Sequence, residues 1–138
     1  LIDMGVEPSL LASALILSQA QRLLRRLCSS CKKPADNLPE EMLREYGIDP
    51  AIFKGTNIHA PKGCPKCHNS GYKGRAAIME VLTVDRDLRN DIVKSVPIKE
   101  VAIKAKNKGM LTLKDVGMNK AKEGLTSIEE ALSVTGGD

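Results

Sequence analysis

The sequence has few aromatic residues and no long apolar run, and each shortage argues against a class of protein. Only Tyr46, Phe53 and Tyr72 are aromatic among 138 residues, and tryptophan is absent. A protein that binds single-stranded nucleic acid would have almost nothing on which to stack bases, so we expect no nucleic-acid partner. The longest apolar run, residues 10–17, contains a serine and is too short to cross a bilayer, so we expect no membrane span.

Motifs of catalysis and export are also missing. The sequence contains no phosphate-binding lysine loop, no glycine-rich dinucleotide fingerprint and no HExxH motif, so we expect no catalytic residue in this chain. No basic stretch precedes an apolar segment near the N-terminus, as a signal peptide would require. We therefore expect a cytoplasmic protein. Because the chain begins at Leu1 in the middle of an apolar pattern, it is interpreted as a piece of a longer polypeptide.

Helical signals dominate both ends of the chain, which predicts an α+β, mainly helical fold. Proline is tolerated at the first helical position, so Glu7-Pro8 predicts a helix from Pro8 to Leu27. Capping residues and glycines predict four more helices at 85–94, 97–108, 112–123 and 127–132, the last with capping-box spacing between Ser127 and Glu130. Between the two ends we expect a short helix at 39–46, a short strand at 57–60 and, at 75–84, a segment that suits either strand or helix.

Four cysteines carry the one strong chemical signal. Cys28 and Cys31 form one CxxC pair, and Cys64 and Cys67 form a second after 32 intervening residues. A CxxC pair bends the chain so that two sulfurs point to one place, and two such knuckles supply the tetrahedral shell that Zn²⁺ accepts from thiolates. Four cysteines leave no open coordination position, so the spacing predicts one structural zinc ion rather than a catalytic one.

Three other interpretations of these cysteines fit the sequence less well than a zinc site does. Structural disulfides need an oxidising compartment, to which nothing in the sequence points. A dithiol redox site uses one CxxC pair rather than two, and four ordinary core cysteines would rarely fall into two such pairs. His68 directly follows Cys67, but adjacent ligands strain a tetrahedral site, so we interpret it as a solvent residue or one beside the ligands. Residues 28–75 carry a charge of +3, which favours the thiolate form.

Three stretches of the sequence together resemble the C-terminal end of the secretion-type traffic ATPases, the assembly motors of type IV pili and type II secretion systems. They are LIDMGVEPSLLASALILSQAQRLLRRLC (1–28), GCPKCHNSGYKGRAAIMEVL (63–82) and GMLTLKDVGMNKAKEGLTSIEEALSVT (109–135). The tetracysteine loop followed by GYxGR is typical of this branch of the family. The resemblance implies that residues 1–27 end a RecA-like ATPase domain, that 28–75 form a zinc-binding subdomain and that 76–138 form a small C-terminal helical bundle.

The resemblance also implies a function for the whole protein. The intact protein would be a hexameric ATPase that uses ATP and Mg²⁺ upstream of this chain, lies peripherally at the inner membrane and acts on a platform protein there. Cys28, Cys31, Cys64 and Cys67 would hold the metal, and Arg75 of GYxGR would lie near the nucleotide or a subunit interface. A zinc-ribbon module that binds nucleic acid or protein is the alternative, and salt-dependent binding to DNA or RNA would distinguish it.

Overall fold

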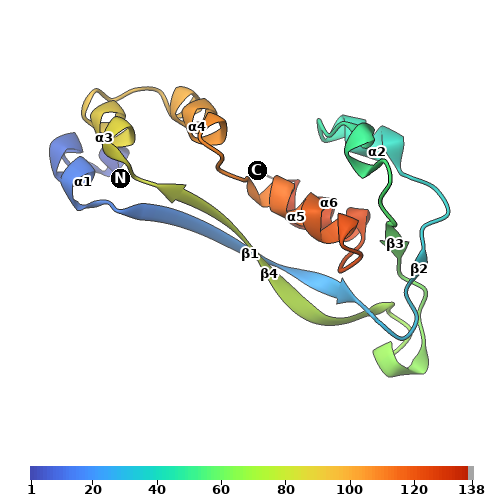
Figure 1. The fold of residues 1–138 in the computed structure, drawn as a ribbon. Helices are drawn as coiled ribbons and strands as arrows, with labels where there is room; N and C mark the ends of the chain where they lie inside the picture. Colours follow the sequence, from blue (N-terminus) through green and yellow to red (C-terminus); the bar gives the residue numbers. More distant parts are fainter. Residues whose placement is uncertain (137–138) are drawn as a thin grey trace. The chain divides into compact units, whose positions relative to one another are not determined.

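The computed structural model describes residues 1–136 as an α+β fold. Six α-helices and two two-stranded sheets lie within this described range (Figure 1). The helices are α1 (Pro8–Ala14), α2 (Glu40–Glu45), α3 (Arg86–Val93), α4 (Ile98–Asn107), α5 (Leu113–Lys122) and α6 (Ile128–Thr135). The strands are β1 (Leu17–Leu27), β2 (Lys33–Pro34), β3 (His59–Ala60) and β4 (Tyr72–Thr83), and the short 3-10 helices are η1 (Ile2–Met4), η2 (Pro50–Phe53) and η3 (Pro65–Cys67).

The helix expected from Pro8 to Leu27 is wrong beyond its first two turns. Helix α1 ends at Ala14, and the chain then continues as β1, which pairs with β4. Residues 19–26 are good helix formers by intrinsic propensity, but a distant partner strand overrides that preference. Pairing with β4 satisfies one edge of the β1 backbone, and Leu24 and Leu27 of this strand are buried.

The remaining element predictions agree with the structure where local chemistry controls them. The Asp85 carboxylate accepts a hydrogen bond from the Leu88 N–H at the start of α3, and Ser127 accepts one from the Glu130 N–H at the start of α6. Gly47 and Gly109, which follow α2 and α4, adopt positive φ values. The segment 75–84, which suited either strand or helix, lies in β4 (Tyr72–Thr83) except for its last residue.

The chain packs into two compact units, each built from two separate stretches: Leu1–Ala20 with Glu80–Thr112, and Gln21–Met79 with Leu113–Asp138. In the first unit α1 packs on α3, and the Arg89 guanidinium donates to the Ala12 carbonyl at 2.6 Å. In the second unit α2, η2, α5 and α6 enclose one apolar core. Its buried members are Leu43, Phe53, Met118, Ala121, Ile128, Ala131 and Leu132.

Strand β1 is joined to the start of α6 through one nearly buried carboxylate. Glu130 is 6% exposed, and its oxygens accept hydrogen bonds from the Arg25 backbone N–H at 2.9 Å and from the Arg25 guanidinium at 2.9 and 2.6 Å. The Arg25 guanidinium also lies over the Tyr72 ring, 4.3 Å from its centroid, and the Tyr72 hydroxyl meets the Ser127 hydroxyl at 2.8 Å. These contacts fix the edge of the sheet against the helices of the second unit.

The capping box expected at α6 is only half formed. The Ser127 hydroxyl caps the helix, but the Glu130 carboxylate turns to Arg25, 105 residues away in the sequence. A partner with a full positive charge and three donors stabilises a carboxylate better than one backbone N–H does.

Within residues 1–136, no helix is both long and apolar enough to pass through a membrane.

We predict that Arg25→Gln destabilises the second unit more than Glu130→Gln does. The first change leaves a nearly buried carboxylate without its cation and should cost about 2 kcal/mol in the free energy of unfolding. Urea denaturation of both variants and of the double variant at neutral pH measures the difference. Equal costs for the two single variants would contradict the prediction.

The same pair predicts the pH dependence of stability. Burial opposes ionisation of Glu130, but the hydrogen bonds and charge of Arg25 outweigh it and hold the pKa below its ordinary value of 4.5. The contribution of the pair is therefore complete above pH 4.5 and is lost as the pH falls through the pKa of the folded state. The penalty of Arg25→Gln should shrink in the same acidic range, because the carboxylate then becomes protonated.

Candidate metal centre

Four cysteine sulfurs converge at the end of the second unit where β1 finishes and β4 begins. Cys28 directly follows β1, and Cys31 lies one turn later, whereas Cys64 precedes the short η3 helix and Cys67 is its last residue. All four sulfurs lie within 4.8 Å of one another, and no imidazole or carboxylate belongs to this cluster. The structure thus brings together all four cysteines that the sequence predicted, and leaves His68 exposed outside the group.

Backbone hydrogen bonds bring the two cysteine pairs together. The Cys28 N–H donates to the Gly71 carbonyl at 2.9 Å, which joins the first pair to the exit of the second. Within the first pair, the Cys31 and Lys32 N–H groups both donate to the Cys28 carbonyl. Within the second, the Cys67 N–H donates to the Cys64 carbonyl at 3.1 Å. Each CxxC segment is therefore a tight turn whose two sulfurs point the same way.

The spacing of the sulfurs fits a tetrahedral zinc shell. The Sγ–Sγ distances are 3.9 Å for Cys28 and Cys64, 3.8 Å for Cys31 and Cys67, and 3.7 Å for Cys64 and Cys67. A regular tetrahedron with zinc–sulfur bonds of about 2.3 Å has edges of about 3.8 Å. All four cysteines are free thiols, so the cluster is not a pair of disulfides and could hold a metal ion.

The electrostatics of the cluster favour some thiolates over others. Burial opposes ionisation of Cys67, but the N–H groups of Cys64 and Gly71 point at its sulfur and help lower the pKa to about 6. Burial raises the pKa of Cys31 to about 11, against the opposing N–H of Gly63. A cation in the centre of the cluster removes this conflict, because it stabilises all four thiolates at once and displaces their protons.

Besides the shared apolar core, the loop that carries the cysteines contacts the helical part of the unit at Gly124. The Lys32 ammonium donates to the Gly124 carbonyl at 2.9 Å, and a Cβ at Gly124 would lie 2.6 Å from Nδ1 of His59. Strands β2 and β3 hold these partners close, since Lys33 pairs with Ala60 and Pro34 with His59. No local signal in the sequence revealed this attachment, because its members are far apart along the chain.

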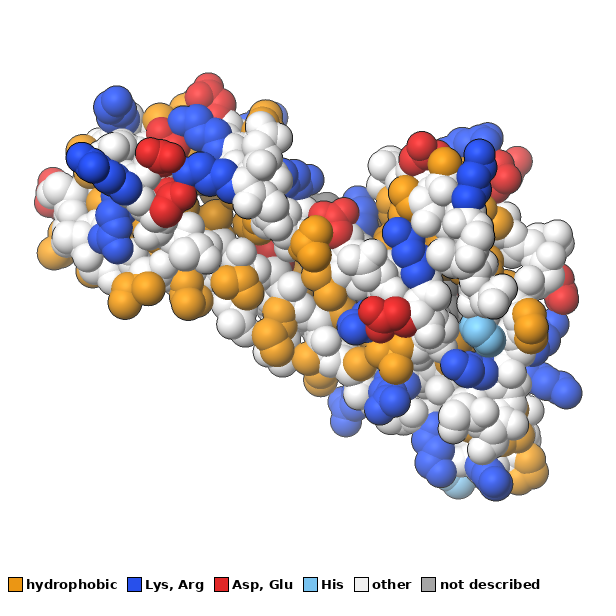
Figure 2. All heavy atoms as spheres, viewed as in Figure 1, with side chains coloured by type: hydrophobic (Ala, Val, Ile, Leu, Met, Phe, Trp, Pro, Cys, Tyr) orange, Lys and Arg blue, Asp and Glu red, His pale blue; other side chains and the backbone are white. Residues whose placement is uncertain are grey.

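Basic side chains surround the cluster. Figure 2 shows lysine and arginine side chains gathered at the lower end of the molecule, around the segment that contains η3. Arg75 lies in the first part of β4, is exposed, and lines a shallow hollow of about 440 Å³ together with Arg25, Ser70, Tyr72 and Gly74. The expectation that Arg75 lies near a nucleotide or at a subunit interface stays a prediction.

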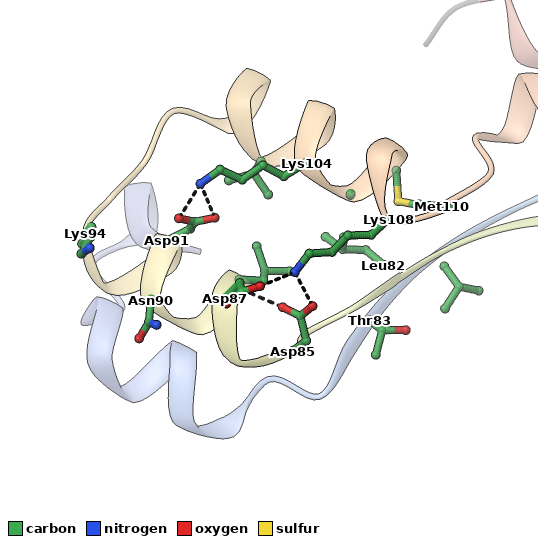
Figure 3. Close-up of a pocket in the computed structure, with 15 residues that line it drawn as sticks. Leu82, Thr83, Asp85, Asp87, Asn90, Asp91, Lys94, Lys104, Lys108 and Met110 are labelled. Carbon is green, nitrogen blue, oxygen red and sulfur yellow. Dashed lines mark hydrogen bonds and ion pairs between the residues drawn. The ribbon is translucent and has the colours of Figure 1, made fainter.

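A larger hollow, in the first unit, holds paired charges and no reactive centre. It measures about 630 Å³ and lies between α3, α4 and the end of β4 (Figure 3). Lys104 binds both oxygens of Asp91 at 2.8 and 2.9 Å, and Lys108 bridges Asp85 and Asp87 at 2.6 and 2.7 Å. No residue of α4 is buried, and these ion pairs join the end of β4 and α3 to α4 and its C-terminal end.

The fold and the sulfur cluster together define a small α+β module with four cysteines that could hold one metal ion. Residues 1–133 match the family described as "Type II/IV secretion system protein". The chain belongs to this family, as its three resembling stretches predicted.

The curated relatives fall into two groups by name. The chain is 42% identical over 133 residues to the type IV pilus assembly ATPase PilB of Thermus thermophilus, covering 96% of this chain and 15% of the relative. It is 37% identical over 138 residues to PilB of Myxococcus xanthus, covering 100% and 24%. It is 39% identical over 137 residues to the type II secretion system protein E of Pseudomonas aeruginosa, covering 98% and 26%. The chain thus spans about a quarter or less of the length of these relatives.

Gly71 provides a test of how the cysteine pairs are held. It adopts a φ of +78°, and a Cβ there would lie 2.4 Å from Cβ of Pro61, whereas Gly55 has a φ of +74° with nothing within 4 Å. We predict that Gly71→Ala destabilises the second unit by about 2 kcal/mol more than Gly55→Ala, and weakens metal binding as well. Denaturation curves and metal competition titrations on both variants check this, and matching results would contradict it.

Proposed function

We propose that this chain is the zinc-binding C-terminal part of a hexameric ATPase that powers type IV pilus assembly or type II protein secretion. The observation that carries the proposal is the four-sulfur cluster, found in a chain that belongs to this family and matches motor ATPases of both systems over nearly its whole length. The intact protein would bind ATP and Mg²⁺ outside this chain. It would lie peripherally at the inner membrane and act on a platform protein there.

In this proposal Cys28, Cys31, Cys64 and Cys67 hold one structural Zn²⁺ as thiolates. When bound, the ion supplies no substrate chemistry, because four sulfurs complete its shell. The chain's own residues do the rest: backbone N–H groups stabilise the thiolates, and the hydrogen bond between Cys28 and Gly71 keeps the pairs in register. A loop too small for a core of its own then keeps one shape, as a surface that transmits movement must.

Exposed apolar residues support the proposed position after a RecA-like domain. Leu1, Met4, Leu10 and Ile16 are 64%, 81%, 62% and 71% exposed, and all belong to the first unit. Apolar side chains so close in sequence and so exposed favour burial against another part of the protein. We propose residues 1–27 as the last part of the ATPase domain, 28–75 as the zinc-binding subdomain and 76–138 as the C-terminal subdomain.

We predict one tightly bound zinc ion per chain with an all-sulfur shell. Metal analysis after dialysis should give about one equivalent of zinc, and X-ray absorption should show zinc–sulfur distances near 2.3 Å with no nitrogen ligand. Removal of the metal with a chelator should abolish amide protection around residues 28–75 while α3 keeps its own, because α3 belongs to the other unit. Substoichiometric zinc, or a histidine ligand, would refute the metal assignment.

We also predict that loss of the metal leaves ATP binding unchanged but abolishes pilus assembly or secretion. The isolated chain should not hydrolyse ATP, because it carries no phosphate-binding motif. In the intact protein, Cys64→Ser should leave nucleotide affinity unchanged but abolish pilus assembly or secretion. Ser30→Ala, in the first knuckle but not a ligand, is the matched control and should behave as wild type. Normal assembly or secretion by the Cys64→Ser protein would rule out the coupling role.

A further inference from the structure

Both stretches that carry the cysteines lack acidic residues. No aspartate or glutamate occurs in 8–35 or in 50–79, and together these stretches contain ten lysines and arginines. The acidic residues of the second unit lie elsewhere, in 36–49 and after residue 113. Positive charge is therefore concentrated where the two knuckles meet. One explanation is that these cations balance the negative charge of the four cysteine thiolates.

Balancing the thiolates does not account for all of this charge. Within residues 1–136, Arg25 pairs with Glu130, and Lys33 pairs with Asp36. Five exposed cations close to the knuckles in sequence carry no ion pair there: Arg26, Lys62, Lys66, Lys73 and Arg75. A zinc ion with four thiolates has a net charge of −2, which offsets only two of the five. The surface is left with a positive charge that nothing described in the chain neutralises.

The hollow beside Tyr72 offers donors of the right kind for a carboxylate. Glu130 engages Nε and Nη2 of Arg25, which leaves Nη1 without a partner among the described residues. Arg75 lines the same hollow, and Gly74 places no side chain in it. Two guanidinium groups at one hollow match the planar, two-oxygen shape of a carboxylate better than lysines would.

We propose that this basic surface binds an acidic segment of another protein, with one carboxylate in the hollow between Arg25 and Arg75 and further carboxylates near Lys62, Lys66 and Lys73. The inference deepens the proposed function, on which it rests, by naming the chemistry of the partner at the coupling surface. The knuckles hold these cations on a backbone fixed by the hydrogen bonds around the cysteines, so little conformational entropy is lost on binding.

Other anionic partners fit the surface less well. A lipid surface is held by basic residues together with apolar side chains that enter the acyl boundary, and none of the exposed large apolar residues described lies between Ile52 and Met79. Single-stranded nucleic acid needs free aromatic faces, and the Arg25 guanidinium lies over the ring of Tyr72. Duplex DNA is read by a helix or a two-stranded ribbon in the major groove; η3 has only three residues, and Lys62 and Lys66 lie outside the β1–β4 ribbon, so a DNA duplex is one of the ligands in the test.

The test compares ligands on the intact protein. A fluorescent peptide of alternating glutamate and serine should bind at about 150 mM salt, while its glutamine counterpart should not. Vesicles of phosphatidylcholine with phosphatidylglycerol, and a short DNA duplex, serve as the competing ligand classes. The triple variant Lys62→Glu, Lys66→Glu and Lys73→Glu should bind the acidic peptide at least about tenfold more weakly, and Arg75→Gln should lose part of the affinity.

A second triple variant distinguishes binding at a local site from a general effect of the net charge of the protein. Lys94→Glu, Lys99→Glu and Lys106→Glu change the net charge equally but lie in the first unit, so this variant should keep wild-type affinity. Equal losses in the two triple variants, no peptide binding, or tighter binding of vesicles or DNA through Lys62, Lys66 and Lys73 would each overturn the proposal.

If the same preparations hold zinc and hydrolyse ATP, the motor function stands even where the peptide does not bind. If they do not hydrolyse ATP, the motor function fails whatever the peptide does.

Discussion

The hydrogen bond between the Cys28 N–H and the Gly71 carbonyl is the contact on which the cysteine end of the molecule depends. It joins the residue that follows β1 to the residue that precedes β4, so the pairing of two long strands brings two distant CxxC turns to one place. Gly71 is required there twice over, since its φ is positive and Pro61 occupies the space of a side chain. The four-sulfur cluster is thus a consequence of strand pairing as much as of cysteine spacing.

A second long-range constraint holds the same strand from the other side. Glu130 satisfies both the backbone and the side chain of Arg25, and the Thr126 hydroxyl donates to the Arg25 carbonyl at 2.8 Å. The Leu27 N–H, two residues further on, donates to the Leu125 carbonyl. The turn between α5 and α6 therefore provides hydrogen bonds to β1 that a two-stranded sheet leaves unmade. The Glu130 carboxylate is stable at this nearly buried position because Arg25 provides both the positive charge and the hydrogen-bond donors that face it.

The sequence predicted those features that a few neighbouring residues determine. The start of α3 follows from Asp85 and that of α6 from Ser127, because a cap acts within one turn. The closeness of the two sulfurs within each CxxC pair follows from its spacing, whereas the meeting of the two pairs also depends on the pairing of β1 with β4. The helix expected through Gln19 failed because the fate of that segment depends on β4, more than fifty residues later. The attachment of Lys32 and His59 to Gly124 has no local signature, so it could be found only in three dimensions.

The ion pair between Arg25 and Glu130 also bears on the order in which the chain acquires its structure. The contact joins residues 105 positions apart, and the core of the second unit needs residues from both ends of that interval. During synthesis the cysteine turns would leave the ribosome well before α5 and α6 exist to cover them. Contacts of such sequence separation form slowly, so the knuckles must survive for a time without the helices that later enclose their loop. Early metal capture at the cysteines would shorten that exposed interval.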